Sequence, residues 1–138
     1  MDMEIVFPSP SGKRVDAKFK GFTIKTDQPV LAGGQGSAPA PFDLFLASIG
    51  TCAGIYVLSF CQQRGLSTDG VRIIQKMIRD DTNRRISTIV LEIELPPDFP
   101  EQYKDAVVRS AELCAVKKYI QDPPEFEIKT NLVSVDNL

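Results

Sequence analysis

The sequence predicts an α+β fold built as one domain over residues 1–138, with antiparallel sheets packed against two long helices. Patterns typical of strands and of helices follow one another in the order strands, long helix, two strands, helix, strand, and no internal repeat or linker divides them. The 138 residues are 43% hydrophobic and 25% charged, values typical of a globular domain that forms its own core.

Strands are expected before the first helix. Residues 3–7 predict a short strand, and the Pro, Ser and Gly residues at 8–12 predict a turn. Apolar and charged residues alternate over 15–20, which is the period of a half-buried strand. Gly21 is expected to form a bulge, after which the same strand continues and ends at residues 27–29.

A long helix is predicted from Pro41 to about Arg64, after a loop of small residues at 32–39. Pro41 suits the first turn, where its missing N–H is not needed, and Asp43 places negative charge near the positive end of the helix dipole. Gly65 is the expected stop. Small residues recur at spacings of three and four, at Ala47, Gly50, Thr51 and Gly54. This face would let another helix approach closely, and together with the apolar surface of the helix it predicts a tight homodimer.

The second half of the chain predicts a hairpin, a helix and a strand. Residues 71–78 and 85–95 read as two antiparallel strands joined at 80–83. A second long helix is expected over 100–122, because apolar residues fall on one stripe at helical spacing: Tyr103, Ala106, Val107, Ala111 and Cys114. Alternation at 126–130 predicts a last strand.

Composition excludes several functions. The formal net charge of −2 leaves no basic surplus for nucleic acid, and no secretory signal is visible at the N-terminus, so we expect a cytoplasmic protein. The charge-free run from Leu44 to Gln63 is long enough to cross a bilayer. It contains several polar residues and has no second such run beside it, which favours a buried core helix and no membrane partner. Three cysteines without any histidine argue against a zinc site, and we expect no metal or cofactor.

The cysteines offer two interpretations. On a helix that advances ~100° per residue, Cys61 lies nine positions after Cys52 and points to the opposite face. Cys114 lies on the apolar stripe of the second helix, so any disulfide that forms should join it to Cys52. Cys52 is too far into its helix for the dipole to help, so a thiolate there would need an Arg or Lys from another segment. Alternatively, all three thiols are inert and serve as small buried hydrophobes.

The segment Pro41-Phe42-Asp43-Leu44-Phe45-Leu46-Ala47-Ser48-Ile49-Gly50-Thr51-Cys52 resembles the Pro-x-(Glu/Asp)-Leu-...-Cys signature of the OsmC/Ohr family of thiol peroxidases. The preceding loop, Gly33-Gly34-Gln35-Gly36-Ser37-Ala38-Pro39, is similar to the glycine-rich approach to that helix. Cys114-Ala115-Val116 matches the second family cysteine, and the order of elements agrees over essentially the whole chain.

This resemblance implies an intertwined homodimer in which strands of one chain complete the sheet of the other and the thiols lie at the interface. It implies that Cys52 is the peroxidatic cysteine, which attacks a hydroperoxide, and that Cys114 is the resolving cysteine, which condenses with the sulfenic acid to a disulfide. It also implies a dithiol reductant similar to a lipoyl group.

One departure from the family matters. The family places a glutamate ten positions before the reactive cysteine, where it holds an arginine against the thiolate; here that position is Phe42. Asp43 is expected to stabilise the helix start instead. Lys13 and Arg14 are the basic candidates in the first hairpin, and Arg14 is the predicted activator unless both are only exposed turn residues.

Two functions remain open at this point. The first is a cysteine-dependent hydroperoxide reductase, favoured by the paired cysteines. The alternative is a non-enzymatic dimeric module that binds a small hydrophobic ligand in a groove around Phe42, Phe45 and Tyr56, favoured by the missing glutamate.

Overall fold

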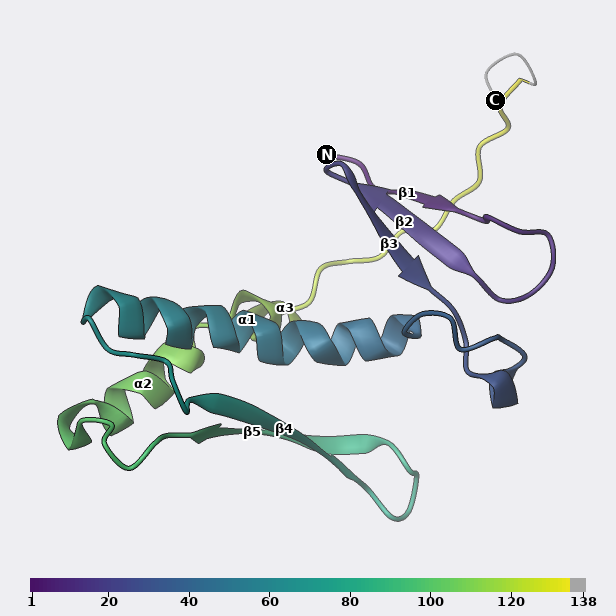
Figure 1. Cartoon of the computed structure of the whole chain (residues 1–138). Coiled ribbons are helices and arrows are strands. Elements are labelled where there is room, and N and C mark those ends of the chain that lie inside the picture. Colours follow the sequence, from purple (N-terminus) through teal and green to yellow (C-terminus); the bar gives the residue numbers. More distant parts are fainter. Residues whose placement is uncertain (135–138) are drawn as a thin grey trace.

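The computed structural model describes residues 1–134 and confirms the predicted α+β class. Two antiparallel sheets and one long helix form its framework (Figure 1). The elements, in chain order, are β1 (Glu4–Val6), β2 (Val15–Phe19), β3 (Phe22–Thr26), η1 (Val30–Ala32), α1 (Pro41–Gln63), β4 (Arg72–Arg79), β5 (Ile86–Glu94), η2 (Glu101–Tyr103), α2 (Lys104–Ala111) and α3 (Ala115–Gln121).

The first sheet has the order β1-β2-β3 and stands apart from the unit formed by α1, β4 and β5 (Figure 1). The predicted bulge at Gly21 is wrong. Lys20 and Gly21 both have positive φ, 51° and 81°, and Phe19 pairs with Phe22, so these two residues form a tight hairpin turn that separates β2 from β3. Two consecutive positive φ angles give the turn whose twist matches that of paired strands.

Helix α1 begins and ends close to the predicted residues. The carboxylate of Asp43 accepts a hydrogen bond of 3.0 Å from the backbone N–H of Ala40, which satisfies one of the free donors at the helix start. Pro41 is the first helical residue, Arg64 is the C-cap, and Gly65 follows with φ 64°. The expected role of Asp43 at the helix start is therefore confirmed.

The small-residue face of α1 meets a strand, so the predicted approach of a second helix there is wrong within the chain. Gly50 lies under Gln75 of β4, whose side-chain amide donates a 3.0 Å hydrogen bond to the carbonyl of Leu46. Gly54 faces Ile73. The absence of a Cβ at these positions lets β4 lie close to α1.

Strands β4 and β5 pair over their whole length, as the sequence predicts, with an irregularity between Ile78 and Arg79. Two exposed ion pairs join the strands of the hairpin. Arg72 pairs with Glu94 at 2.6 Å, and Lys76 pairs with Glu92 at 2.7 Å. Such exposed pairs contribute little to stability but fit the observed register.

The second predicted long helix is two short helices. Helix α2 ends at Ala111 and α3 begins at Ala115, and Cys114 is the non-helical N-cap of α3, with φ −48° and ψ 119°. The apolar stripe is nevertheless confirmed: Val107, Ala111 and Cys114 are buried in one core cluster. That cluster also contains Ala53, Val57, Phe60, Cys61 and Phe99.

The predicted last strand is wrong for the single chain, because residues 123–134 have no regular secondary structure. Phe126, Ile128 and Leu132 are 86%, 97% and 99% exposed. An alternating pattern forms a strand only when a neighbouring strand supplies hydrogen bonds, and the described part of the chain offers none to this segment.

Helix α1 is also less covered than the sequence predicts for a core helix. By length and composition it is the one helix among residues 1–134 that could cross a bilayer. Only 28% of its most apolar 18-residue stretch is buried. Phe42, Phe45 and Ile55 on this helix are 56%, 41% and 52% exposed.

Candidate thiol site

Cys52 and Cys114 come together where α3 crosses α1. Cys52 is half-buried on α1 and packs against the core cluster that contains Cys114. Cys114 is 1% exposed. All three cysteines are free thiols. The predicted disulfide between Cys52 and Cys114 stays a prediction, but the two residues lie on facing elements as it requires.

The pKa of Cys52 is lowered, chiefly by the backbone N–H of Val116, with smaller contributions from the thiol of Cys114 and the backbone N–H of Ala115. Burial acts in the opposite direction and raises it. Donors that point at a sulfur stabilise its charged form, which is the nucleophilic form. We expected an Arg or Lys to perform this role. In the described residues the groups that lower the pKa are instead backbone N–H groups of α3 and the neighbouring side chain of Cys114.

The sulfur of Cys114 bridges two helices. Its thiol donates to the backbone carbonyl of Ile49 on α1 at 3.8 Å, and its Sγ accepts from the backbone N–H of Lys117 on α3 at 3.5 Å. Ile49 lies three residues before Cys52, which is nearly one helical turn. Sulfur is a weak donor and a weak acceptor, but here both bonds form at a site closed to water.

Cys61 has different surroundings. It is fully buried, and burial raises the pKa of its thiol, an effect that the nearby charge of Arg64 partly offsets. The guanidinium of Arg64 stacks over the ring of Phe60 at 3.7 Å from the centroid and therefore has an aromatic partner of its own. A buried thiol with a raised pKa is a poor nucleophile.

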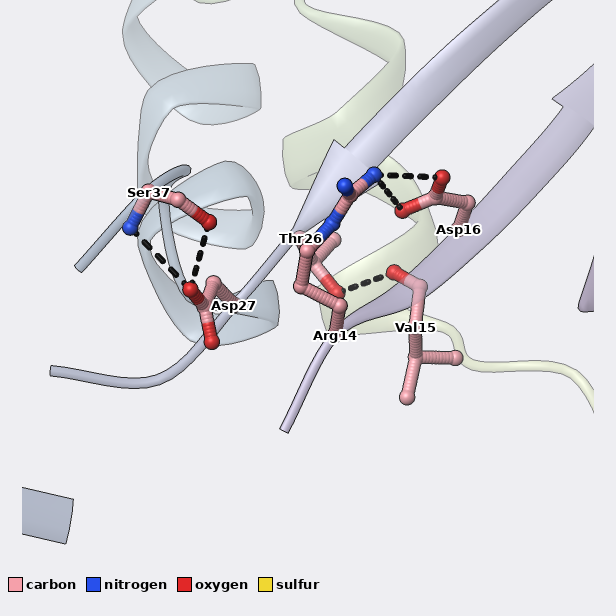
Figure 2. Close-up of polar contacts among 6 residues, drawn as sticks. All are labelled: Arg14, Val15, Asp16, Thr26, Asp27 and Ser37. Atoms are coloured by element: carbon pink, nitrogen blue, oxygen red, sulfur yellow. Dashed lines mark hydrogen bonds and ion pairs between the residues drawn. The ribbon is translucent and has the colours of Figure 1, made fainter. Parts of the chain in front are cut away.

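Arg14, the predicted activator, is bonded within the first sheet. Its Nη2 atom donates to both carboxylate oxygens of Asp16, at 2.8 and 3.1 Å (Figure 2). Asp16 is 5% exposed, so the ion pair is partly buried. Arg14 is not among the groups that shift the pKa of Cys52 in the single chain, and its activating role stays a prediction. The aliphatic part of Lys13 packs near Gly33.

An apolar groove of about 650 Å³ runs along α3, and neither Cys52 nor Cys114 lines it. Phe45 of α1 forms one wall, and α3 with the segment after it forms the other, through Ala115, Val116, Tyr119, Ile120, Pro123, Pro124 and Phe126. Phe42 stacks on Phe45 with ring centroids 5.6 Å apart. Of the three residues around which a groove was expected, Phe45 lines this one, and Phe42 and Tyr56 do not.

Asp27 is a buried polar residue whose role the sequence did not reveal. Its carboxylate accepts hydrogen bonds from the backbone N–H groups of Gln28 at 2.7 Å and Gln35 at 3.4 Å. It also accepts from the backbone N–H of Ser37 at 3.0 Å and from the Ser37 hydroxyl at 2.5 Å (Figure 2). These bonds, led by that of the Ser37 hydroxyl, lower the pKa of Asp27 to about 2. Asp27 thereby fixes the glycine-rich loop that leads into α1. The available signal was an aspartate just before a Pro- and Gly-rich loop.

Comparison with known proteins identifies the family and the fold. The sequence profile of the OsmC-like protein family matches residues 34–129. No curated protein matches the chain in sequence.

Solved structures share the fold. A candidate osmotic stress induced and detoxification response protein from Psychrobacter arcticus superposes with a TM-score of 0.68 at 20% identity, covering 84% of this chain and 85% of that one. An OsmC-like protein from Mycoplasma pneumoniae gives 0.64 at 15% identity, covering 88% and 87%. An organic hydroperoxide resistance protein OsmC from Legionella pneumophila gives 0.52 at 19% identity, covering 87% and 88%. The family profile spans both cysteines of the thiol site and the helix that carries the first of them, and the chain belongs to the OsmC-like protein family.

Proposed function

We propose that the protein is a cysteine-dependent reductase of organic hydroperoxides, with Cys52 as the peroxidatic and Cys114 as the resolving cysteine. The observation that carries the proposal is that Cys52 and Val116 pack against the buried core cluster that contains Cys114, where the backbone of α3 and the Cys114 side chain lower the pKa of Cys52. Family membership and the hydroperoxide resistance named for the Legionella relative support a general role in peroxide stress.

The proposed reaction has three steps. The Cys52 thiolate attacks the terminal oxygen of the hydroperoxide and the O–O bond breaks, which leaves the sulfenic acid of Cys52 and an alkoxide that takes up a proton from water to become the alcohol. The Cys114 thiol then attacks that sulfur, a disulfide forms, and water leaves. A dithiol reductant, of which a lipoyl group is one example, then reduces this disulfide by thiol–disulfide exchange. The reductant itself becomes a disulfide, and both protein thiols are restored.

Geometry favours an organic substrate over a polar one. The groove along α3 is lined by apolar and aromatic side chains, and its lining residues include Ala115 and Val116, whose backbone N–H groups lower the pKa of Cys52. An apolar substituent bound there would leave the peroxide group near the half-buried sulfur.

We also propose that the working form is a homodimer. Phe42, Phe45 and Ile55 of α1 are 56%, 41% and 52% exposed. Residues 123–134 carry an alternating apolar pattern without a partner strand in the described part of the chain. A second copy would cover both surfaces, as apolar patches of this size require. Light scattering at micromolar concentration should give twice the mass of the chain, and a monomer would contradict this part of the proposal.

The alternative function is a non-enzymatic module that binds a small hydrophobic ligand. The same groove supports it, as does the absence of any charged side chain among the groups that lower the pKa of Cys52. The two functions differ in what happens to the thiols.

Titration with cumene hydroperoxide separates them. We expect one equivalent to consume two thiols per chain, to lower the intact mass by two hydrogens, and to give the same result in a Cys61→Ser control. Unchanged thiol content with saturable binding of cumyl alcohol would favour the binding module and contradict the peroxidase.

A further inference from the structure

Cys114 holds the elements of the thiol site together before any disulfide forms. We propose that Cys114 is a positioning residue for Cys52, because its buried sulfur joins α3 to the turn of α1 that precedes Cys52. This inference deepens the proposed function and rests on Cys52 acting as a thiolate.

The first step concerns the contacts of the sulfur. One bond runs from the Cys114 thiol to the carbonyl of Ile49 on α1, and the other runs from the backbone N–H of Lys117 on α3 to the same sulfur. The position that Cys114 occupies, the N-cap, usually holds Ser, Thr, Asp or Asn, whose side-chain oxygen accepts from the first turn of the helix. Here sulfur performs that function at a site 1% exposed, where water cannot replace it.

The second step concerns the length of α3. This helix has seven residues and no acidic residue in its first turn, so its own internal bonds give it little stability. Helices this short depend on caps and tertiary contacts. The backbone of Lys118 adds one bond, to the carbonyl of Cys114 at 3.2 Å, which again anchors α3 at Cys114.

The third step links α3 to the reactive thiol. Cys52 and Val116 pack against the same core cluster around Cys114. The backbone N–H groups that lower the pKa of Cys52 belong to Ala115 and Val116, the two residues that follow Cys114. If Cys114 no longer held α3, these groups would lose their fixed position beside the Cys52 sulfur. No lysine, arginine or carboxylate among residues 1–134 contributes to the shift, so nothing charged would replace them.

The test compares side chains at position 114 that differ in one hydrogen-bonding atom. In a Cys61→Ala background, Cys114, Cys114→Ser and Cys114→Ala are treated with iodoacetamide from pH 5 to pH 10. Peptide mass spectrometry measures the alkylation rate of Cys52 alone. We expect the serine variant to keep the pH profile of the Cys114 protein, because its hydroxyl both donates and accepts. We expect the alanine variant to titrate about one pH unit higher and to react ~10-fold more slowly at pH 7.

A second pair of variants keeps the test valid if the alanine variant does not fold. Threonine and valine have the same shape, so Cys114→Thr and Cys114→Val repeat the comparison with packing held constant. The Cys61→Ala change itself is the matched control, since it removes a sulfur from the same core without touching α3, and it should leave the Cys52 profile unchanged. Coincident profiles for serine and alanine, or for threonine and valine, would overturn the inference.

The assay contains no hydroperoxide, so its outcome is separate from that of the proposed function. A wild-type protein that fails to reduce hydroperoxide but shows the serine-alanine difference would contradict the peroxidase and keep the positioning role. A wild-type protein that reduces hydroperoxide but shows no serine-alanine difference would support the peroxidase and contradict the positioning role.

Discussion

Ser37 donates two hydrogen bonds to the buried carboxylate of Asp27, one from its backbone N–H at 3.0 Å and one from its hydroxyl at 2.5 Å. The two residues lie ten positions apart and close the loop that precedes α1. Because the backbone N–H of Asp27 also donates to the carbonyl of Pro39 at 3.2 Å, the loop is tied at both ends just before the helix starts. The direction in which α1 leaves the first sheet depends on this closure.

Loss of the Asp27 contacts should lower stability in a pH-dependent way. The pKa of Asp27 is about 2 in the folded protein, below the value of 3.8 for an unperturbed carboxyl. A carboxyl with a depressed folded pKa stabilises the protein above pH ~4, and this contribution is lost as the pH falls from ~4 to 2. We expect Asp27→Asn to be less stable than wild type in urea titrations at pH 7, with the difference shrinking below pH 4.

Ser37→Ala is the milder companion variant. It removes one hydroxyl and leaves the carboxylate with its backbone donors, so we expect it to cost about 1.5 kcal/mol at pH 7, less than Asp27→Asn. A difference between wild type and Asp27→Asn that stayed constant down to pH 2 would show that Asp27 is not the titrating group.

The two glycines of α1 should respond differently to the same substitution. A Cβ at Gly50 would lie 2.5 Å from the side-chain oxygen of Gln75, whereas a Cβ at Gly54 would lie 3.9 Å from Ile73. Alanine favours a helix over glycine by ~1 kcal/mol at either position. At Gly50 this gain is offset, because Gln75 must move and lose its bond to the carbonyl of Leu46, about 1 kcal/mol.

Chemical denaturation of the two variants measures this difference. We expect Gly54→Ala to exceed Gly50→Ala in free energy of unfolding by about 1 kcal/mol, and Gln75→Ala to abolish most of that gap when combined with each. Equal stabilities in the wild-type background would mean that Gln75 moves at no cost.

The sequence predicted α1 and the second hairpin well because their signals are local. Pro41, Asp43 and Gly65 mark the ends of α1 through backbone chemistry that acts within a few residues. Helical spacing predicted the buried stripe of Val107, Ala111 and Cys114. These residues are buried together even though the helix is interrupted before Cys114.

The break between α2 and α3 could not be predicted in the same way. Residues 112–114 contain no glycine or proline, and the Cys114 thiol donates to the carbonyl of Ile49, sixty-five residues earlier, a contact that the local sequence does not reveal. The role of Asp27 also depends on a residue that is distant in the sequence, because its carboxylate accepts from Ser37, ten positions later. The candidate site therefore needed the structure, although both of its cysteines were found from the sequence.

Arg14 should contribute to stability through Asp16. Removal of the guanidinium leaves a carboxylate that is 5% exposed without its ionic partner, so we expect Arg14→Ala to cost about 3 kcal/mol in thermal or urea unfolding. Combining it with Asp16→Ala should restore much of this loss, because no unpaired charge remains. The double variant also tests the predicted activation of Cys52: wild-type rates of hydroperoxide consumption in the double variant would exclude Arg14 from that role.

The final prediction separates the two thiols of the proposed reaction, because a nucleophile and a resolving cysteine fail differently when removed. In a Cys61→Ser background, Cys52→Ser should abolish hydroperoxide consumption, since Cys114 is 1% exposed and bonded to Ile49. Cys114→Ser should keep the first attack, because serine retains the cap of α3. The sulfenic acid of Cys52 then has no thiol to condense with and advances to sulfinic and sulfonic acid under excess hydroperoxide.

Intact-mass spectrometry distinguishes these results. We expect added oxygens on the Cys114→Ser protein, a loss of two hydrogens on the protein with both thiols, and no change on Cys52→Ser. If the protein with both thiols gained oxygens and formed no disulfide, the resolving role of Cys114 would be wrong, although its cap on α3 could still set the reactivity of Cys52. If neither protein changed mass, the thiols would be structural, and the apolar groove beside Phe45 would become the functional centre of the molecule.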